Sequence, residues 1–186
     1  MAATPPPPAP IPPIPPMSTL DAVVSALDSV IEWSIAASSR LGYFAAVYKR
    51  ITIAVGAAVK NGAFQDGPRM ERFDASFAGR YFDALNGLFH PNEFPRPTLS
   101  WQRTFDAADR VDLIILQHVL SGVNAHIDLD LGIAAQNIAP AMKLPTLHDD
   151  FNTINAVLAS QVKSLVDDIN QLVAQPGRAL PDPRRQ

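Results

Sequence analysis

The chain has 186 residues, of which 47% are hydrophobic and 18% charged. This length and balance are typical of one globular domain with an apolar core, and they exclude global disorder. Lys and Arg total 15 against 18 Asp and Glu, and the net charge of -3 argues against nucleic acid as a partner. The sequence has no Cys, which excludes disulfides, thiolate metal sites and cysteine nucleophiles and suits a reducing compartment.

The two ends of the chain differ in composition from the region between them. Nine of the 18 prolines lie in the first 16 residues. Because proline locks φ and lacks an N–H, we expect residues 1–17 to form a disordered Pro-rich tail, with the alternative that this tail binds a protein partner. Residues 176–186 are also rich in Pro and Arg, and we expect a flexible C-terminal tail there. Residues 18–175 are then a single helical domain.

No targeting or membrane signal is evident in the sequence. The first 16 residues contain neither Lys nor Arg, and they lack the apolar segment of a secretory signal. The longest charge-free apolar stretches, such as residues 51–59, fall short of the roughly 20 residues that span a bilayer. We therefore expect a soluble, cytoplasmic protein with no membrane span.

Between the tails, apolar residues recur at steps of three and four, which is typical of amphipathic helices. Ser18 and Asp21 resemble a capping box for the first helix, Asn61-Gly62 suits the end of the second, and Pro68 can begin the third. The pattern predicts helices over residues 20–31, 44–59, 68–88, 100–139 and 147–175. No stretch alternates like a strand, so the sequence predicts an all-α bundle of five or six helices.

The pattern does not decide whether the fourth segment, residues 100–139, forms one helix or two. It runs from about Ser100 to Ala139, where Pro140 ends it, and Gly122 is the position at which it would bend or divide. The last helix has the clearest amphipathic pattern, which runs through Phe151, Ile154, Leu158, Val162, Leu165, Ile169 and Leu172.

The most informative stretch is HVLSGVNAHIDLDL, residues 118–131. On a helix with about 100° per residue, His126 and Asp130 lie about 40° apart and roughly 6 Å apart along the axis. Their face is otherwise apolar, with Ile115, Val119, Val123 and Ile133. Asn124 and Asp128 lie on the opposite, polar face with Gln117 and Ser121. The pattern therefore turns one imidazole and one carboxylate toward the core.

A carboxylate in an apolar interior loses several kcal/mol of hydration unless it finds a partner or takes up a proton. Three hypotheses for His126 and Asp130 remain open. The two side chains pair with each other as a structural network, share a divalent metal ion such as Zn or Fe, or act as an acid–base pair on a bound small molecule.

A metal site would need ligands from elsewhere in the chain. Candidates are Asp74, His118 and Asp150. On an unbroken helix His118 lies about 12 Å from His126 along the axis, so it could join only if the helix breaks at Gly122.

Arg80 and Tyr81 are candidates to bind a cofactor or other small molecule. Arg80 is also a candidate partner for Asp74 or Asp130, although a solvated surface charge is the commoner place for an Arg. Trp101 is more typical of a packing residue than of a binding residue.

The stretch GVNAHIDLDL resembles the helix G-x-N-A-H-I-x-x-D-L of a bacterial family of unknown function, in which Q-H-x-L-x-G often precedes it. Here the motif residues are Gln117, His118, Gly122, Asn124, Ala125, His126, Ile127, Asp130 and Leu131. Weaker resemblance at residues 73–85, at Trp101 and at residues 150–155 extends it over most of the chain between about residues 40 and 170. The family has no established activity, so the resemblance implies a domain identity and draws attention to Asn124, His126 and Asp130 as catalytic candidates.

The sequence therefore supports three functions. The first is a metal-dependent, hydrolase-like enzyme in which the ion activates water or polarises a substrate. The second is a noncatalytic binding or scaffold bundle whose His126–Asp130 cluster fixes the packing of the helices. The third is a pocket that performs metal-free acid–base chemistry on a small molecule.

Overall fold

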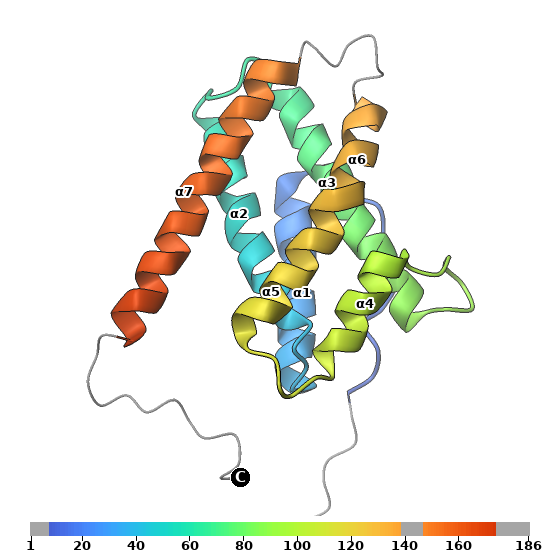
Figure 1. Cartoon of the computed structure of the whole chain (residues 1–186). Coiled ribbons are helices and arrows are strands. Elements are labelled where there is room, and N and C mark those ends of the chain that lie inside the picture. Colours follow the sequence, from blue (N-terminus) through green and yellow to red (C-terminus); the bar gives the residue numbers. More distant parts are fainter. Residues whose placement is uncertain (1–7, 139–146, 174–186) are drawn as a thin grey trace, which may run out of the picture.

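The computed structural model describes residues 8–138 and 147–173, and the side chains of these up to residue 161. Over that part of the chain every regular element is a helix, which confirms the predicted all-α class. The helices are α1 Leu20–Ala36, α2 Gly42–Lys60, α3 Gly67–Phe89, α4 Leu99–Ala108, α5 Ile115–Ala125, α6 Leu131–Ile138 and α7 His148–Val173. A π-helical turn, η1 His126–Asp130, joins α5 to α6 without a break, so that the described elements form six rods (Figure 1).

The ends of the first three helices follow from local chemistry. Thr19 caps α1, because its hydroxyl accepts the N–H of Ala22 at 3.3 Å, whereas the sequence pointed to Ser18 for this position. The second helix ends at Asn61, and Gly62 takes a φ of 68°, which a residue without a Cβ adopts without strain. Pro68 lies in the first turn of α3, as predicted, and the Asp66 carboxylate caps that helix.

The predicted fourth segment is two helical rods, and the division lies elsewhere than at Gly122. It falls between α4 and α5, at residues 109–114, where Arg110 pairs with Asp112. Gly122 lies inside an unbroken α5, which packs back against α4. The expected break was wrong because residues 109–114 contain neither Gly nor Pro, so that no strong local signal marks the turn.

Helices α2 and α3 organise the rest of the fold (Figure 1). Helix α2 packs against α1, α3, α5 and α7, while α3 also contacts α6 and η1. The core between them is rich in aromatic side chains, which are Phe44, Tyr48, Phe73, Tyr81, Phe82, Trp101 and Phe105. Because η1 lies beside this aromatic core, its residues His126 and Asp130 are buried, whereas its third polar residue, Asp128, is exposed.

Residues 8–17 of the N-terminal Pro-rich segment contact the helices. These residues form no regular element and lie against the helices, with Ile11 buried. The side chain of Asn86 clamps Ile14, because its Oδ1 accepts the Ile14 N–H at 2.8 Å and its Nδ2 donates to the Ile14 carbonyl at 2.9 Å. Trp33 donates its indole N–H to the carbonyl of Ala9 at 2.7 Å. Because prolines have no N–H to donate, this segment is held mainly through its backbone carbonyls.

Several expectations lie outside the described residues. They are the tail over residues 1–7, the helix end at Pro140 and the flexible tail at 176–186. The side chains of the last helix beyond residue 161 also fall outside, and with them the second half of its predicted apolar stripe.

Candidate functional site

Gly122 lets helix α5 approach α2 closely. A Cβ built on Gly122 would lie 2.5 Å from the ring of Phe44, which is closer than real side chains come. One turn further on, the helix widens into η1 and turns His126 and Asp130 into the core, with 3% and 1% of their surfaces exposed. Single π-helical turns inside α-helices are frequent at functional sites. The predicted inward orientation of these two residues is therefore confirmed.

Asp130 accepts hydrogen bonds from three other side chains. Its Oδ1 lies 3.3 Å from Arg80 Nε, and its Oδ2 lies 2.8 Å from Trp101 Nε1 and 3.3 Å from His126 Nδ1. The donors come from α3, α4 and η1. Arg and Trp donate but do not accept, so the buried carboxylate is paired and stabilised as an acceptor. Of the two acids predicted as partners for Arg80, Asp130 is thus the one that it meets, and the Arg80 side chain is 30% exposed.

The hydrogen bond to Asp130 also sets the proton on His126. Because the carboxylate only accepts, Nδ1 of the ring carries the hydrogen, and Nε2 of the neutral ring is an acceptor. Burial lowers the pKa of His126 and outweighs the opposing effect of the Asp130 hydrogen bond, so the ring is neutral near pH 7. Phe77 stacks on the ring with 3.6 Å between centroids and 8° between planes. Nε2 is buried and has no hydrogen-bond partner.

His126 lines an apolar pocket of about 150 Å³ between α2, α3, the rod that α5, η1 and α6 form, and α7. Two more buried polar groups line it, the hydroxyl of Tyr48 and the carboxyl of Asp74. Neither the Tyr48 Oη nor the Asp74 Oδ2 has a hydrogen-bond partner. The other lining residues are Phe44, Ile51, Phe73, Phe77, Val123, Ile127, Leu131, Phe151, Ile154, Asn155 and Leu158. Three unpartnered polar atoms therefore belong to residues that share one largely apolar pocket.

The surroundings of the pocket favour the protonated, neutral forms of its acidic side chains. Burial raises the pKa of Asp74 from 3.8 to about 7, since no cation or donor compensates its charge. Burial also raises the pKa of Tyr48, and the charges of Asp74 and Asp130 add to that effect. Near neutral pH the pocket therefore offers a carboxyl group that can hold or release a proton.

Asp150 has a structural role at the start of α3. Its carboxylate accepts the backbone N–H groups of Gln65 and Asp66 at 2.6 and 3.2 Å and a hydrogen bond from Arg69 Nη2 at 2.9 Å. Burial would raise the pKa of Asp150, but these hydrogen bonds and the Arg69 charge lower it. The side chain holds α7 against the N-terminus of α3, so that one wall of the pocket is fixed in place.

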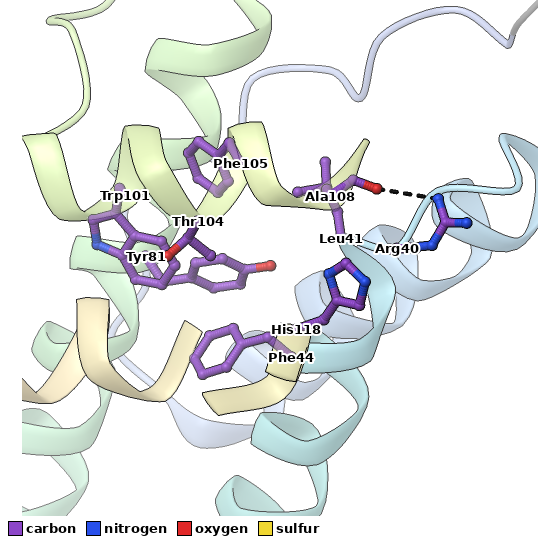
Figure 2. Close-up of a pocket in the computed structure, with 9 residues that line it drawn as sticks. All are labelled: Arg40, Leu41, Phe44, Tyr81, Trp101, Thr104, Phe105, Ala108 and His118. Atoms are coloured by element: carbon purple, nitrogen blue, oxygen red, sulfur yellow. Dashed lines mark hydrogen bonds between the residues drawn. The ribbon is translucent and has the colours of Figure 1, made fainter. Parts of the chain in front are cut away.

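His118 and Tyr81 belong to a different, much smaller pocket (Figure 2). Its volume is about 10 Å³, roughly the room that one water molecule needs. Figure 2 shows the Tyr81 hydroxyl and the His118 ring pointing toward the same small space, with Arg40 at its far side. Burial and the charge of Arg40 lower the pKa of His118. This space is too small for an organic cofactor.

The structure therefore separates the predicted site residues. It brings together His126, Asp130 and Arg80, and it places Asp74 in the adjoining pocket. Asn124 is exposed on the opposite face of the helix, which removes it from the neighbourhood of His126 Nε2. Ile115, which the pattern placed on the buried face, is 59% exposed.

The five candidate metal ligands do not gather around one point. His118 and Asp150 lie elsewhere, and among the side chains that the structure describes, which end at residue 161, no group of three or more His, Asp or Glu could hold a metal ion. His126 and Asp130 alone make one direct contact, at 3.3 Å. One contact of that kind is the geometry of an imidazole–carboxylate hydrogen bond.

Sequence reasoning missed the pocket residues Tyr48 and Phe77 and assigned Trp101 to packing. Trp101 does pack in the core, and in addition its N–H bonds Asp130. Tyr48 and Phe77 look like ordinary members of apolar stripes, because only the packing of α2 against α3 and η1 brings them to His126. The single available signal was the phenol of Tyr48, a polar tip on a predicted buried face.

The fold and the site define an all-α protein with a buried Arg–Asp–His network beside an apolar pocket. The chain belongs to DUF5995, a family of unknown function whose model matches residues 20–183. This match confirms the resemblance to a family of unknown function that the sequence motif indicated. No curated protein and no solved structure shows detectable similarity to the chain. Among the described helices, none combines the length and the apolar character that crossing a membrane requires.

Proposed function

We propose that the protein binds a small, largely apolar molecule in the pocket beside His126 and performs metal-free acid–base chemistry on it. The observation that carries this proposal is the buried, unpartnered Nε2 of His126 in a ring that lines the pocket. Asp130 fixes the tautomer through Nδ1, and Phe77 fixes the plane of the ring. An imidazole held in this way is suited to serve as a general base.

The chemistry needs a proton acceptor and a proton donor. Nε2 of His126 can accept a proton from a water or hydroxyl group bound beside it, and the imidazolium that forms is stabilised by Asp130. Asp74, with a pKa of about 7, can pass its proton to the bound molecule and recover one when His126 releases the proton that it has taken up. The surrounding rings keep bulk water away, which strengthens each of these interactions.

Binding can be tested with toluene, whose size suits a pocket that is comparable to cavities known to hold benzene. We expect thermal stabilisation and ligand-observed NMR to detect toluene on the full chain. Val123→Phe, which fills the pocket from α5, should abolish this binding. Leu129→Phe is the matched control, because Leu129 lies on η1 but is exposed and outside the pocket.

The catalytic half of the proposal can be tested with phenyl acetate, a small aromatic ester. We expect His126→Gln to reduce its hydrolysis by at least about 100-fold, the lower range of general-base effects. His148→Gln is the control, since the His148 side chain is 74% exposed. An unchanged rate in His126→Gln would rule out the acid–base role while leaving toluene binding as a separate result.

The scaffold alternative is favoured by a specific observation. Asp130 ties α3, α4 and η1 together through three hydrogen bonds, which is what a purely structural network also requires. That function predicts that His126→Gln lowers stability and that the pocket takes up no toluene. The metal-dependent hydrolase would instead require added Zn or Fe to stabilise the full chain through His126 and Asp130.

Two predictions from the sequence remain proposals. A protein partner for the Pro-rich segment would have to compete with Asn86 and Trp33 for residues 8–17. The cytoplasmic location rests on the cysteine-free composition of the chain.

A further inference from the structure

Three buried aspartates in the described part of the chain, Asp74, Asp130 and Asp150, differ in their partners. Asp130 is paired with Arg80, and Asp150 with Arg69. Asp74 is equally buried, at 2% exposure, yet its Oδ2 has no hydrogen-bond partner. Because an unpaired buried carboxylate is strongly unfavourable, Asp74 stands out as a group that lacks the cation or donor its neighbours have.

The pocket that Asp74 lines has no positive charge of its own. Of the described residues around it, none is Lys or Arg, and the ionisable ones are Tyr48, Asp74 and His126. Arg80, on the same helix as Asp74, hydrogen-bonds Asp130 instead. The pocket therefore has one carboxyl group and no internal counter-ion.

The walls around Asp74 are aromatic. Phe73 and Phe77 flank it along α3 and stack with 6.2 Å between centroids, and Tyr48 meets Phe77 edge to face at 6.3 Å. Phe44 and Phe151 complete the aromatic lining. Aromatic ring faces attract organic cations through their quadrupoles, most strongly where water is excluded. A carboxylate beside such rings discriminates between an ammonium group and a neutral polar group of the same size.

We propose that the ligand of this pocket is a small organic amine, bound as an ammonium ion between the Asp74 carboxylate and the rings of Tyr48, Phe73 and Phe77. This inference rests on the proposed function, since it names the class of molecule that the same pocket takes. A volume of about 150 Å³ limits the ligand to roughly the size of benzylamine. The apolar body packs against Val123, Ile154 and Leu158, while the amine satisfies the one acid that the protein leaves unpaired.

The test compares benzylamine with its neutral counterpart, benzyl alcohol, by calorimetry on the full chain at pH 8. We expect benzylamine to bind at least tenfold more tightly. Asp74→Asn, which keeps the shape of the side chain, should reduce this ratio to about one. Asp128→Asn, at an exposed position of η1, should leave the ratio unchanged.

Each outcome separates this inference from the proposed function. If benzyl alcohol binds as tightly as benzylamine, or if Asp74→Asn keeps the tenfold ratio, the amine assignment is wrong while the pocket stands. If neither compound binds and toluene also fails, both the amine assignment and the proposed function are overturned. The wild-type comparison of the two compounds holds even if Asp74→Asn does not fold.

Discussion

The two sides of the His126 ring use buried carboxyl groups in opposite ways. On the side of α4, Asp130 receives hydrogen bonds from Arg80, Trp101 and His126, and it is nearly inaccessible. On the side of α7, Asp74 lies in an apolar pocket with an unpartnered oxygen. The first arrangement stabilises the fold, because the buried carboxylate accepts from three donors. The second destabilises it, and this contrast supports our proposal that the pocket binds a ligand.

Removing the paired carboxylate of Asp130 is expected to cause the largest loss of stability. Asp130→Ala leaves the guanidinium of Arg80, the indole N–H of Trp101 and Nδ1 of His126 without their acceptor. Breaking a buried ion pair in this way destabilises proteins by about 3–5 kcal/mol. Urea unfolding measures the loss, and the exposed Asp128→Ala is the control, for which we expect a change within about 0.5 kcal/mol. A loss below about 1 kcal/mol would show that the network is not a structural element.

Replacing the unpaired carboxyl group of Asp74 is expected to stabilise the protein, by an amount that depends on pH. The pKa of Asp74 is raised from 3.8 to about 7 in the folded chain, so its contribution to stability is full below pH 3.8 and is lost as pH rises through 7. Asp74→Asn should therefore gain stability relative to wild type with rising pH, by up to about 4 kcal/mol above pH 7. Urea unfolding at several pH values between 4 and 8.5 measures this difference.

His126 produces the opposite trend in both proteins. Its folded pKa is lowered below 6.5, so the stability that its neutral ring contributes falls as pH drops below 6.5. Because wild type and Asp74→Asn share His126, its effect cancels in the difference between them. A difference that stays constant with pH would contradict the assignment of Asp74 as the unpaired acid.

The smallest expected effect on stability comes from Gly122, which lets α5 approach α2 closely. Gly122→Ala puts a methyl group 2.5 Å from the ring of Phe44, and overpacking of this kind destabilises by about 1–3 kcal/mol. Gly132→Ala is the matched control on the same rod, because nothing lies within 4 Å of its Cβ. The control should gain up to about 1 kcal/mol from helix propensity. Thermal unfolding of both variants tests this, and equal shifts would mean that Phe44 does not pack against Gly122.

The sequence predicted the network better than the pocket. A helix of 3.6 residues per turn places His126 and Asp130 on one apolar face, whatever packs against that face. Arg80 was a candidate partner for Asp130 because a buried carboxylate needs a donor. The pocket could not be predicted from the sequence, because its walls come from α2, α3, η1 and α7. No local pattern in the sequence indicates how these helices pack together.

The errors have the same physical origin. The turn at residues 109–114 has neither Gly nor Pro, and the packing of α5 back against α4 decides it. The contacts of the Pro-rich residues 8–17 were likewise not predictable, because nothing in their composition reveals that Asn86 and Trp33 bind their backbone. His118 and Asp150 were grouped with His126 by residue type, and the fold places them in other surroundings.

The sequence by itself determined the helical class, most helix ends and the inward orientation of His126 and Asp130, because these depend on periodicity, caps and the free energy of burying polar groups. Only the tertiary structure decided which buried acid is paired and which is not. Pairing depends on side chains that lie far apart in the sequence, such as Arg80 and Asp130 or Arg69 and Asp150. Helix packing brings these groups within hydrogen-bonding distance and leaves Asp74 facing a pocket.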